Sequence, residues 1–438
     1  MKTGVNILTN FPQLKFYCLF YLLFTFYLIL LCWFITRLNF FKESGLENRI
    51  LIGLFLIRVS VGLVNGYINL YYYPVSDAAS FQFQGIEEYH LLFQNPSEYF
   101  INIFHSNHNV GYGNFLESSD SFWNDTRSFL IVKMLSVFNI FSRMNFFINS
   151  LFYNFLIFFG TVALYRVFIK TFPAYRLVLI ACIFLLPSVI YFSSSIHRDG
   201  LIYLSLSMVI YHLFFMMQNK KYSLKNILSI LIFLALILLL RSFVFITLVP
   251  AIIAWMFAEY KPKYAFIIFS GIYLFISVLF FSTGFLSPSL NLPAHVSSRQ
   301  IDFIIIAKRS ASAININPLY PNFRSFLNNI PQALNHSFMR PYLTEHLNFL
   351  YIPSGLEIFC YEILFLIFIV FRKKNIAISP LICFSVFFAS TMFLVIGYTI
   401  PIIGAIVRYR SIYLPFILIP IICYTDWKKI KAIFHITI

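Results

Sequence analysis

Charged residues are scarce in this chain of 438 residues: they make up 11%, against about 25% in an average soluble domain. Acids are rarer still, with 16 Asp and Glu in the whole sequence. The six cysteines all lie in or beside apolar segments, without the spacing of zinc ligands or of a disulfide framework. These scarcities exclude a soluble domain and a disulfide-rich scaffold, and we expect neither a metal nor a cofactor.

Hydrophobic residues are abundant instead, at 60% of the chain, with a mean hydropathy of +0.81. Apolar stretches near the roughly 20 residues that cross a bilayer recur from end to end. The sequence therefore predicts an all-α, polytopic transmembrane bundle of about eleven spans (10–12). The expected spans are 14–36 (a retained helix, not a signal peptide), 51–74, 147–169, 177–195, 201–217, 226–240, 243–258, 264–283, 355–371, 376–398 and 411–425.

The connections between these spans fall into two sets that alternate along the chain. Short loops carry 17 of the 32 Lys and Arg residues but only 4 of the 16 acids, which marks them as cytoplasmic by the positive-inside rule. The net charge of +16 is explained by these loops, without nucleic acid. Two long loops, 75–146 and 284–354, then lie outside. We expect one integral membrane domain over 1–438 with two exterior elaborations.

Each exterior loop contains an apolar segment that we expect to lie along the membrane surface. In 126–145, Lys133 falls within the apolar run and Arg143 follows it, so a full crossing would bury a charge. A flat helix keeps such charges at the lipid headgroups, although a twelfth span stays open. The stretch "RQIDFIIIAKRSASA", 299–313, is expected to behave similarly in the second loop.

Five arginines stand on the outer face where the positive-inside rule disfavours them, and four of them directly enter or leave an apolar span; no lysine stands at such a junction. A planar guanidinium grips phosphate through two hydrogen bonds, whereas lysine acts as a point charge. Any single one is equally well explained by contact with headgroups or with a loop acid. Five together favour a shared outward-facing cavity for a diphosphate. They are Arg198, Arg241, Arg340, Arg408 and Arg410.

Acids and a histidine near the same surface are the candidates for a catalytic base. Asp77 follows the second span and has no basic residue near it in sequence. Asp199 follows Arg198, an obvious neutraliser, so a structural ion pair is an equal alternative. His197 is the third candidate, because histidine titrates near physiological pH. Glu362, inside the ninth span, is better explained by hydrogen bonding between helices.

This arrangement resembles Wzy-type repeat-unit polymerases, which stand with O-antigen ligases among the polytopic glycosyltransferases that use lipid-linked sugars. The likeness covers the whole chain at the level of organisation: ten to twelve spans, two large exterior loops and outer-face arginines. At residue level it depends on three stretches. They are "PSVIYFSSSIHRDGLIYL" (187–204), "RPYLTEHLNFLYIPSGLE" (340–357) and "VRYRSIYLP" (407–415).

The resemblance implies a glycan transferred from undecaprenyl diphosphate to the non-reducing end of another lipid-linked repeat unit, at the outer face of the cytoplasmic (inner) membrane. The five arginines would stabilise the departing diphosphate in place of a metal ion. Asp77, Asp199 or His197 would deprotonate the acceptor hydroxyl. The implied partners are the undecaprenyl-diphosphate-linked oligosaccharide, membrane lipid and, optionally, a chain-length regulator; nucleic acid is not expected.

Two other functions stay open. A glycosyltransferase that takes single sugars from a polyprenyl monophosphate would place an essential acid in the first exterior loop, where Asp77 or the pair Glu87 and Glu88 would serve, often with a divalent metal. A transporter of lipid-linked glycan would show paired repeats and broken helices. No internal repeat is visible in the sequence.

Overall fold

The computed structural model describes residues 15–73, 76–102, 122–286, 291–345, 352–374 and 377–434, and this part of the chain is helical. It contains no strand, only two isolated bridges, Ala313–Ile402 and Arg372–Thr425. Eight helices within the described residues are long and apolar enough to cross a membrane. They are α1 (Lys15–Arg37), α3 (Asn48–Tyr67) with its π-helical end η1 (Ile68–Tyr72), α7 (Phe146–Thr171), α10 (Arg198–Asn219), α12 (Ser242–Tyr260), α13 (Ala265–Leu286), α16 (Ile352–Phe371) and α17 (Pro380–Thr399).

Two further spans are broken. Residues Pro173–Leu185 and α9 (Pro187–Ser194) meet at 42°, and α18 (Ile403–Ser411) meets α19 (Leu414–Tyr424) at 64°. Pro187 and Pro415 each lie in the first turn after a break. Proline lacks a backbone N–H, and in the first turn of a helix this costs no helical hydrogen bond. With α11 (Leu224–Leu240), a shorter apolar helix, every one of the eleven expected spans falls on a helix or a bent pair. The polytopic all-α prediction is confirmed.

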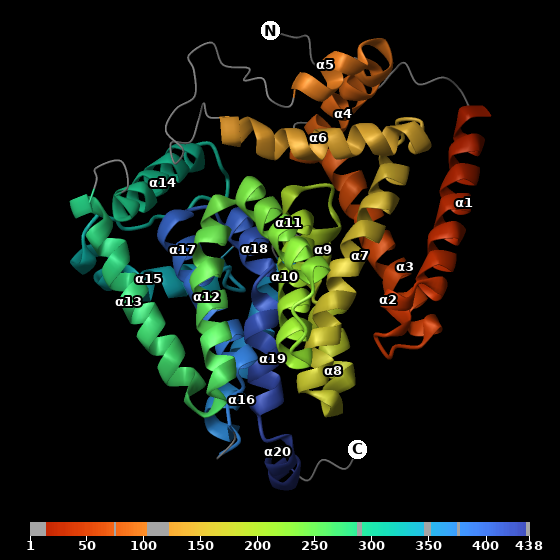
Figure 1. Ribbon diagram of the computed structural model, residues 1–438. Helices are drawn as coiled ribbons and strands as arrows, with labels where there is room; N and C mark the ends of the chain where they lie inside the picture. Colours follow the sequence, from red (N-terminus) through yellow and green to blue (C-terminus); the bar gives the residue numbers. More distant parts are fainter. Residues whose placement is uncertain are drawn as a thin grey trace. The chain divides into compact units, whose positions relative to one another are not determined.

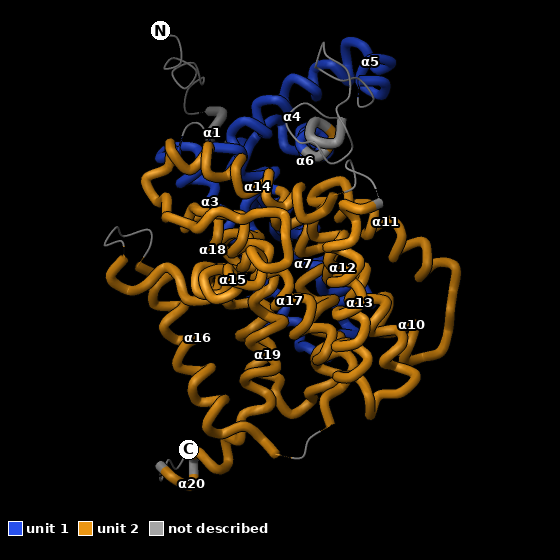
Figure 2. Tube along the Cα trace, turned by 90° about the vertical axis from the view of Figure 1, so that its left-hand side faces the viewer, with its two compact units in different colours: residues 1–103, 128–159, 194–197 blue, residues 104–127, 160–193, 198–438 orange. Residues whose placement is uncertain are grey.

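The chain divides into two compact units (Figure 2). Unit 1 comprises 1–103, 128–159 and 194–197, and unit 2 comprises 104–127, 160–193 and 198–438. The expectation of a single membrane domain over 1–438 stays a prediction.

Unit 1 holds most of residues 75–146, the first of the two loops that the sequence predicts to be exterior. Here α4 (Asp77–Gln94) and α5 (Pro96–Ile101) precede α6 (Phe122–Ser142), and α6 runs crosswise to α3 and α7 in Figure 1. The sharp turn from α6 into α7 uses two residues with positive φ, Arg143 (51°) and Met144 (64°).

A buried chain of amides fixes this crosswise helix. Asn149 on α7 donates to Gln82 on α4 (3.0 Å) and to Asn139 on α6 (2.7 Å), and Asn139 donates to the carbonyl of Gly85 (3.0 Å). Buried polar groups of this kind specify one packing arrangement because each needs its partner. A helix therefore forms in 126–145 as expected, and its apolar part, Ser128–Ser142, is shorter than the spans.

Lys133 on α6 has partners within the protein. Its Nζ lies 2.6 Å from Oε2 of Glu88 and 3.5 Å from the ring centroid of Tyr99, and its side chain is only 13% exposed. The charge is therefore neutralised by a carboxylate and an aromatic face of the same unit. The position of α6 at the membrane surface stays a prediction.

Unit 2 is built around α17, whose sides pack against α12, α13, α19 and α15 (Phe323–Leu334). Gly397 permits the closest approach, because a Cβ at this position would lie 1.9 Å from the carbonyl oxygen of Ala333 on α15. In the second of the two predicted exterior loops, Gln300 on α14 (Leu292–Ala307) donates to the carbonyl of Tyr398 (2.8 Å) and so holds α14 onto the end of α17. The other side of α14 exposes isoleucines, as expected of a helix lying at a membrane surface.

Candidate functional site

The central feature of unit 2 is a buried carboxylate between two arginines. Asp199 has a side chain only 1% exposed, and its Oδ1 lies 2.5 Å from Nη2 of Arg241. Its Oδ2 lies 3.6 Å from Nε of Arg408. Two guanidinium groups around one carboxylate leave a net positive charge, in surroundings where water screens it poorly. We call Asp199, Arg241, Arg408 and the adjoining Tyr409 the Asp199 cluster.

Local structure positions each member of the cluster. Asp199 lies in the first turn of α10, where the helix dipole stabilises a carboxylate. Arg241 is the single extended residue (φ −153°, ψ 93°) between α11 and α12, in the tight turn that the sequence predicts. Arg408 lies in the last turn of α18, where the dipole favours a cation. Each of the three charged residues therefore lies at the end of a helix or between two helices.

Tyr409 links the two arginines. The Cζ atom of Arg241 lies 3.9 Å from the centroid of its ring, a cation–π contact, and Nη2 of Arg408 donates to its hydroxyl over 3.4 Å. The two guanidinium groups differ in access: the Arg241 side chain is 7% exposed and that of Arg408 is 30% exposed. Arg408 is therefore the member of the cluster that an incoming anion can reach.

Arg410 and Arg340 make a second set of contacts. Arg410 is buried, and its Nη1 donates to the carbonyl oxygens of Ser337 (3.1 Å) and Arg340. Arg340 pairs through Nη1 with Oε1 of Glu345 (3.4 Å). Arg410 thus holds η7 (Asn335–Met339) in place through backbone carbonyls, which is a structural role. The five arginines do not share one set of contacts.

Two more titratable groups lie near this second set. Glu357 on α16 accepts hydrogen bonds from the backbone N–H (3.2 Å) and hydroxyl (3.0 Å) of Ser188 and from the Tyr361 hydroxyl, which satisfies a buried acid structurally. His336 on η7 is buried as well. Burial, with the charge of Arg340 second, lowers the pKa of His336 from its usual 6.5 to about 4.

The remaining base candidates lie in unit 1. His197 is buried, and its Nε2 lies 2.8 Å from Oδ2 of Asp77, the first residue of α4. The Asp77 side chain is 55% exposed. The backbone carbonyl of His197 accepts a hydrogen bond from the buried hydroxyl of Tyr153. A carboxylate that orients an imidazole in this way is the arrangement of a general base.

Each predicted site residue thus has a position. Arg241, Arg408 and Asp199 come together in unit 2, Arg340 and Arg410 form the second set, and Asp77 pairs with His197 in unit 1. Arg198 is half-buried at the first residue of α10. Sequence reasoning did not assign roles to Tyr409 or Glu345, although an aromatic ring between two arginines in "RYR" is a signal for a stacked guanidinium.

Within the described ranges, no three His, Cys, Asp or Glu side chains gather in a way that could hold a metal ion. Comparison with protein-family models, curated proteins and solved structures found no match for the chain. Function is therefore inferred from the residues themselves.

Proposed function

We propose that the chain is a membrane glycosyltransferase that polymerises oligosaccharide repeat units carried on undecaprenyl diphosphate, at the outer face of the cytoplasmic membrane. The observation that carries this proposal is the Asp199 cluster, which presents more guanidinium than carboxylate charge and leaves Arg408 partly exposed. An anionic phosphate group is the chemical partner that such a surplus favours.

The chemistry assigned to the cluster is stabilisation of a leaving group. The acceptor hydroxyl oxygen forms a bond to the anomeric carbon of the donor glycan, and the bond from that carbon to the diphosphate oxygen breaks. Negative charge develops on the departing lipid diphosphate. Arg408, held by Asp199 and stacked near Tyr409, would bind this charge, and Arg241 would keep the carboxylate from neutralising Arg408 fully. Preorganised donors of this kind commonly contribute the largest part of catalysis.

The proton of the acceptor hydroxyl also needs a destination. We assign it to Nδ1 of His197, because Nε2 faces Oδ2 of Asp77 (2.8 Å). Asp77 thereby orients the imidazole and balances its positive charge once it is protonated. The partial exposure of Asp77 leaves room for proton exchange with water. This assigns two roles among the three base candidates and leaves Asp199 as an orienting group.

The decisive experiment uses the purified full-length protein in detergent with lipid-linked repeat units. Chain lengthening, read as a ladder of glycan sizes, supports the proposal. Unchanged glycan, from protein that is folded and monodisperse, contradicts it. Addition of a chelator separates the polyprenyl-monophosphate alternative, in which the exposed Asp77 would serve as the essential exterior acid: loss of activity there favours a metal-dependent transferase.

The two broken spans favour a second candidate, a transporter of lipid-linked glycan. Interrupted helices bring charged residues and helix ends to a substrate in many transporters, and Arg408 lies in the last turn before the 64° bend. Detergent removes the two compartments that transport requires, so lengthening in detergent cannot come from this activity. Movement of labelled lipid across a proteoliposome membrane, without lengthening, would identify it.

A further inference from the structure

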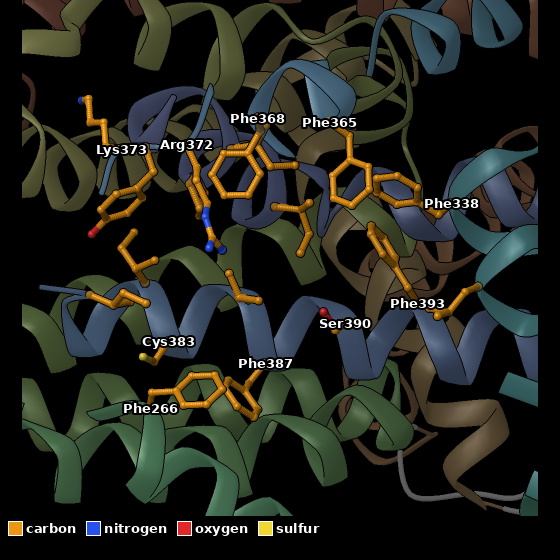
Figure 3. Close-up of a pocket in the computed structure, with 18 of the residues that line it drawn as sticks. Phe266, Phe338, Phe365, Phe368, Arg372, Lys373, Cys383, Phe387, Ser390 and Phe393 are labelled. Atoms are coloured by element: carbon orange, nitrogen blue, oxygen red, sulfur yellow. The ribbon is translucent and has the colours of Figure 1, made fainter. Parts of the chain in front are cut away.

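Unit 2 contains a large cavity, of about 1030 Å³, that takes no part in the proposed reaction. Its walls come from α13, α15, η7, α16, α17, α19 and the segment between α16 and α17. They are lined mainly by aromatic and aliphatic side chains, several of which Figure 3 shows. Sites for drug-sized ligands have volumes of about 300–1,000 Å³. This cavity therefore has room for the chains of a lipid.

The cations of the lining gather at one end. Arg372, Lys373 and Lys374 follow α16 directly. In Figure 3, Arg372 and Lys373 lie at one end of the row of aromatic rings, and Phe338 lies at the other. The cavity is thus apolar along its length and basic at the end formed by Arg372, Lys373 and Lys374, which we call its mouth. This distribution complements a lipid with an anionic headgroup.

This basic mouth is built into the fold. The backbone N–H of Lys373 donates to the carbonyl of Tyr424 (2.9 Å), and the N–H of Asp426 donates to the carbonyl of Phe371 (2.7 Å). Lys373 is engaged by the Tyr175 hydroxyl (2.6 Å) and the Cys423 carbonyl (2.8 Å).

The Arg372 guanidinium, in contrast, points into the cavity in Figure 3. It makes no hydrogen bond or ion pair with any described side chain. A donor fork in this position, without an acceptor among the described side chains, is suited to an external phosphate.

A short helix beside the mouth has the character of a membrane-surface element. Helix α20 (Trp427–Phe434, sequence WKKIKAIF) packs against α16. Lys428 and Lys429 are exposed, whereas the indole of Trp427 donates to the carbonyl of Ile422 (2.8 Å). Basic amphipathic helices of this kind lie at membrane interfaces and are attracted to anionic lipids.

We propose that this cavity binds an anionic diacyl phospholipid, with its acyl chains along the aromatic walls and its phosphate on Arg372, assisted by Lys374. The basic end follows α16 in a short loop that the charge distribution assigns to the cytoplasm, the leaflet in which anionic phospholipids attract basic segments. A lipid-linked glycan at the outer face would carry its phosphates at the other end of the span. The occupant is therefore a phospholipid distinct from the substrate.

Native mass spectrometry of the delipidated full-length protein tests this, with phosphatidylglycerol and phosphatidylethanolamine of identical acyl chains as probes. We expect tighter retention of phosphatidylglycerol by about tenfold, and loss of that preference in the double variant Arg372→Gln, Lys374→Gln. The matched control is Arg309→Gln, an exposed arginine after α14 that does not line the cavity. Equal binding of the two phospholipids, or an unaltered preference in the double variant, would overturn the proposal.

A second experiment tests whether the acyl chains of the phospholipid lie in the cavity. Val386 lines the cavity from α17 and is itself 37% exposed, so Val386→Trp narrows the cavity with little disturbance of the core. We expect weaker binding of phosphatidylglycerol in this variant. Preferential retention of a polyprenyl phosphate over phosphatidylglycerol would instead assign the cavity to the lipid carrier. These measurements do not depend on glycan polymerisation, so they stand or fail separately from the proposed activity.

Discussion

Arg408 and Arg410 point to opposite sides of the same helix. Two residues along an α-helix correspond to a rotation of about 200°. Arg408 accordingly approaches Asp199, whereas Arg410 donates to the carbonyls of Ser337 and Arg340. Helix α18 therefore separates a partly exposed guanidinium, suited to an anionic ligand, from a buried one that supports the fold.

This division predicts different outcomes for the same conservative change. Arg408→Lys keeps the charge but loses the guanidinium fork, so we expect polymerisation to fall by about 100-fold, the scale of losing one transition-state donor, with membrane insertion intact. Arg241→Lys is expected to act in the same direction, because it loosens Asp199. The measurement is the rate of chain lengthening in detergent.

Arg309→Lys serves as the control for both variants, because Arg309 is exposed and outside the cluster. Its activity should equal that of the wild type. Full activity in Arg408→Lys would show that the cluster needs only positive charge, and it would remove the diphosphate role from that guanidinium.

The ion pair between Asp199 and Arg408 predicts strong coupling in a double-mutant cycle. Asp199→Asn leaves the buried Arg241 and the partly exposed Arg408 without their carboxylate. Loss of one partner costs about 3–5 kcal/mol in buried pairs. Combining it with Arg408→Gln should cost less than the sum of the single changes. Thermal unfolding in detergent measures all three variants.

The exposed pair Arg299–Asp302 is the matched comparison for that cycle. Its atoms lie 3.6 Å apart, and its side chains are 42% and 47% exposed. Solvent screens such a pair, so Asp302→Asn should change stability by less than about 1 kcal/mol. Additive effects in the Asp199 cycle would mean that the two residues do not interact energetically.

The pairing of Asp77 with His197 predicts an effect on rate without an effect on stability. Asp77→Asn removes the carboxylate that orients the imidazole, so kcat should fall by about tenfold or more with KM little changed. Asp77→Glu should restore part of the rate. Because the Asp77 side chain is half-exposed, the melting temperature should stay near that of the wild type. Unchanged kcat in Asp77→Asn would assign the pair a purely structural role.

Much of this fold is predictable from the sequence because its strongest signals are local. A span is an uninterrupted apolar run, and the eleven expected runs fall on helices or bent pairs. The tight turn at Arg241 was also predicted, since one polar residue there divides two apolar runs. The break before α19 was not, although Pro415 disfavours helical geometry in the preceding residue.

The partners of the charged residues were harder to predict, because they depend on packing between helices far apart in the chain. Nothing in the sequence indicates that Arg241 and Arg408, 42 and 209 residues further along the chain, approach Asp199. In the same way, nothing in the sequence indicates that Lys133 pairs with Glu88, 45 residues away. Local pattern identifies which residues are out of place in a membrane, and tertiary packing decides which of them meet.

Gly397 predicts a steric effect at the contact between α15 and α17. A methyl group at this position would overlap the carbonyl of Ala333, so Gly397→Ala should force the helices apart and cost about 1–3 kcal/mol. Gly271→Ala on α13 is the matched control, because a Cβ there meets no atom within 4 Å. Thermal unfolding of the two variants should differ clearly, and equal stability would contradict so close an approach.

His336 predicts a loss of stability in acid. Its pKa is about 4 in the folded protein, because burial and the Arg340 charge disfavour the imidazolium, and 6.5 when it is free of those influences. The unfolded chain therefore binds more protons between these values, so the stability that His336 contributes is complete above about pH 6.5 and is lost as the pH falls toward 4. His336→Asn should flatten this part of the stability curve, whereas His90→Gln, at an exposed histidine on α4, should leave it unchanged. An equally steep loss of stability in acid for His336→Asn would mean that groups other than His336 cause it.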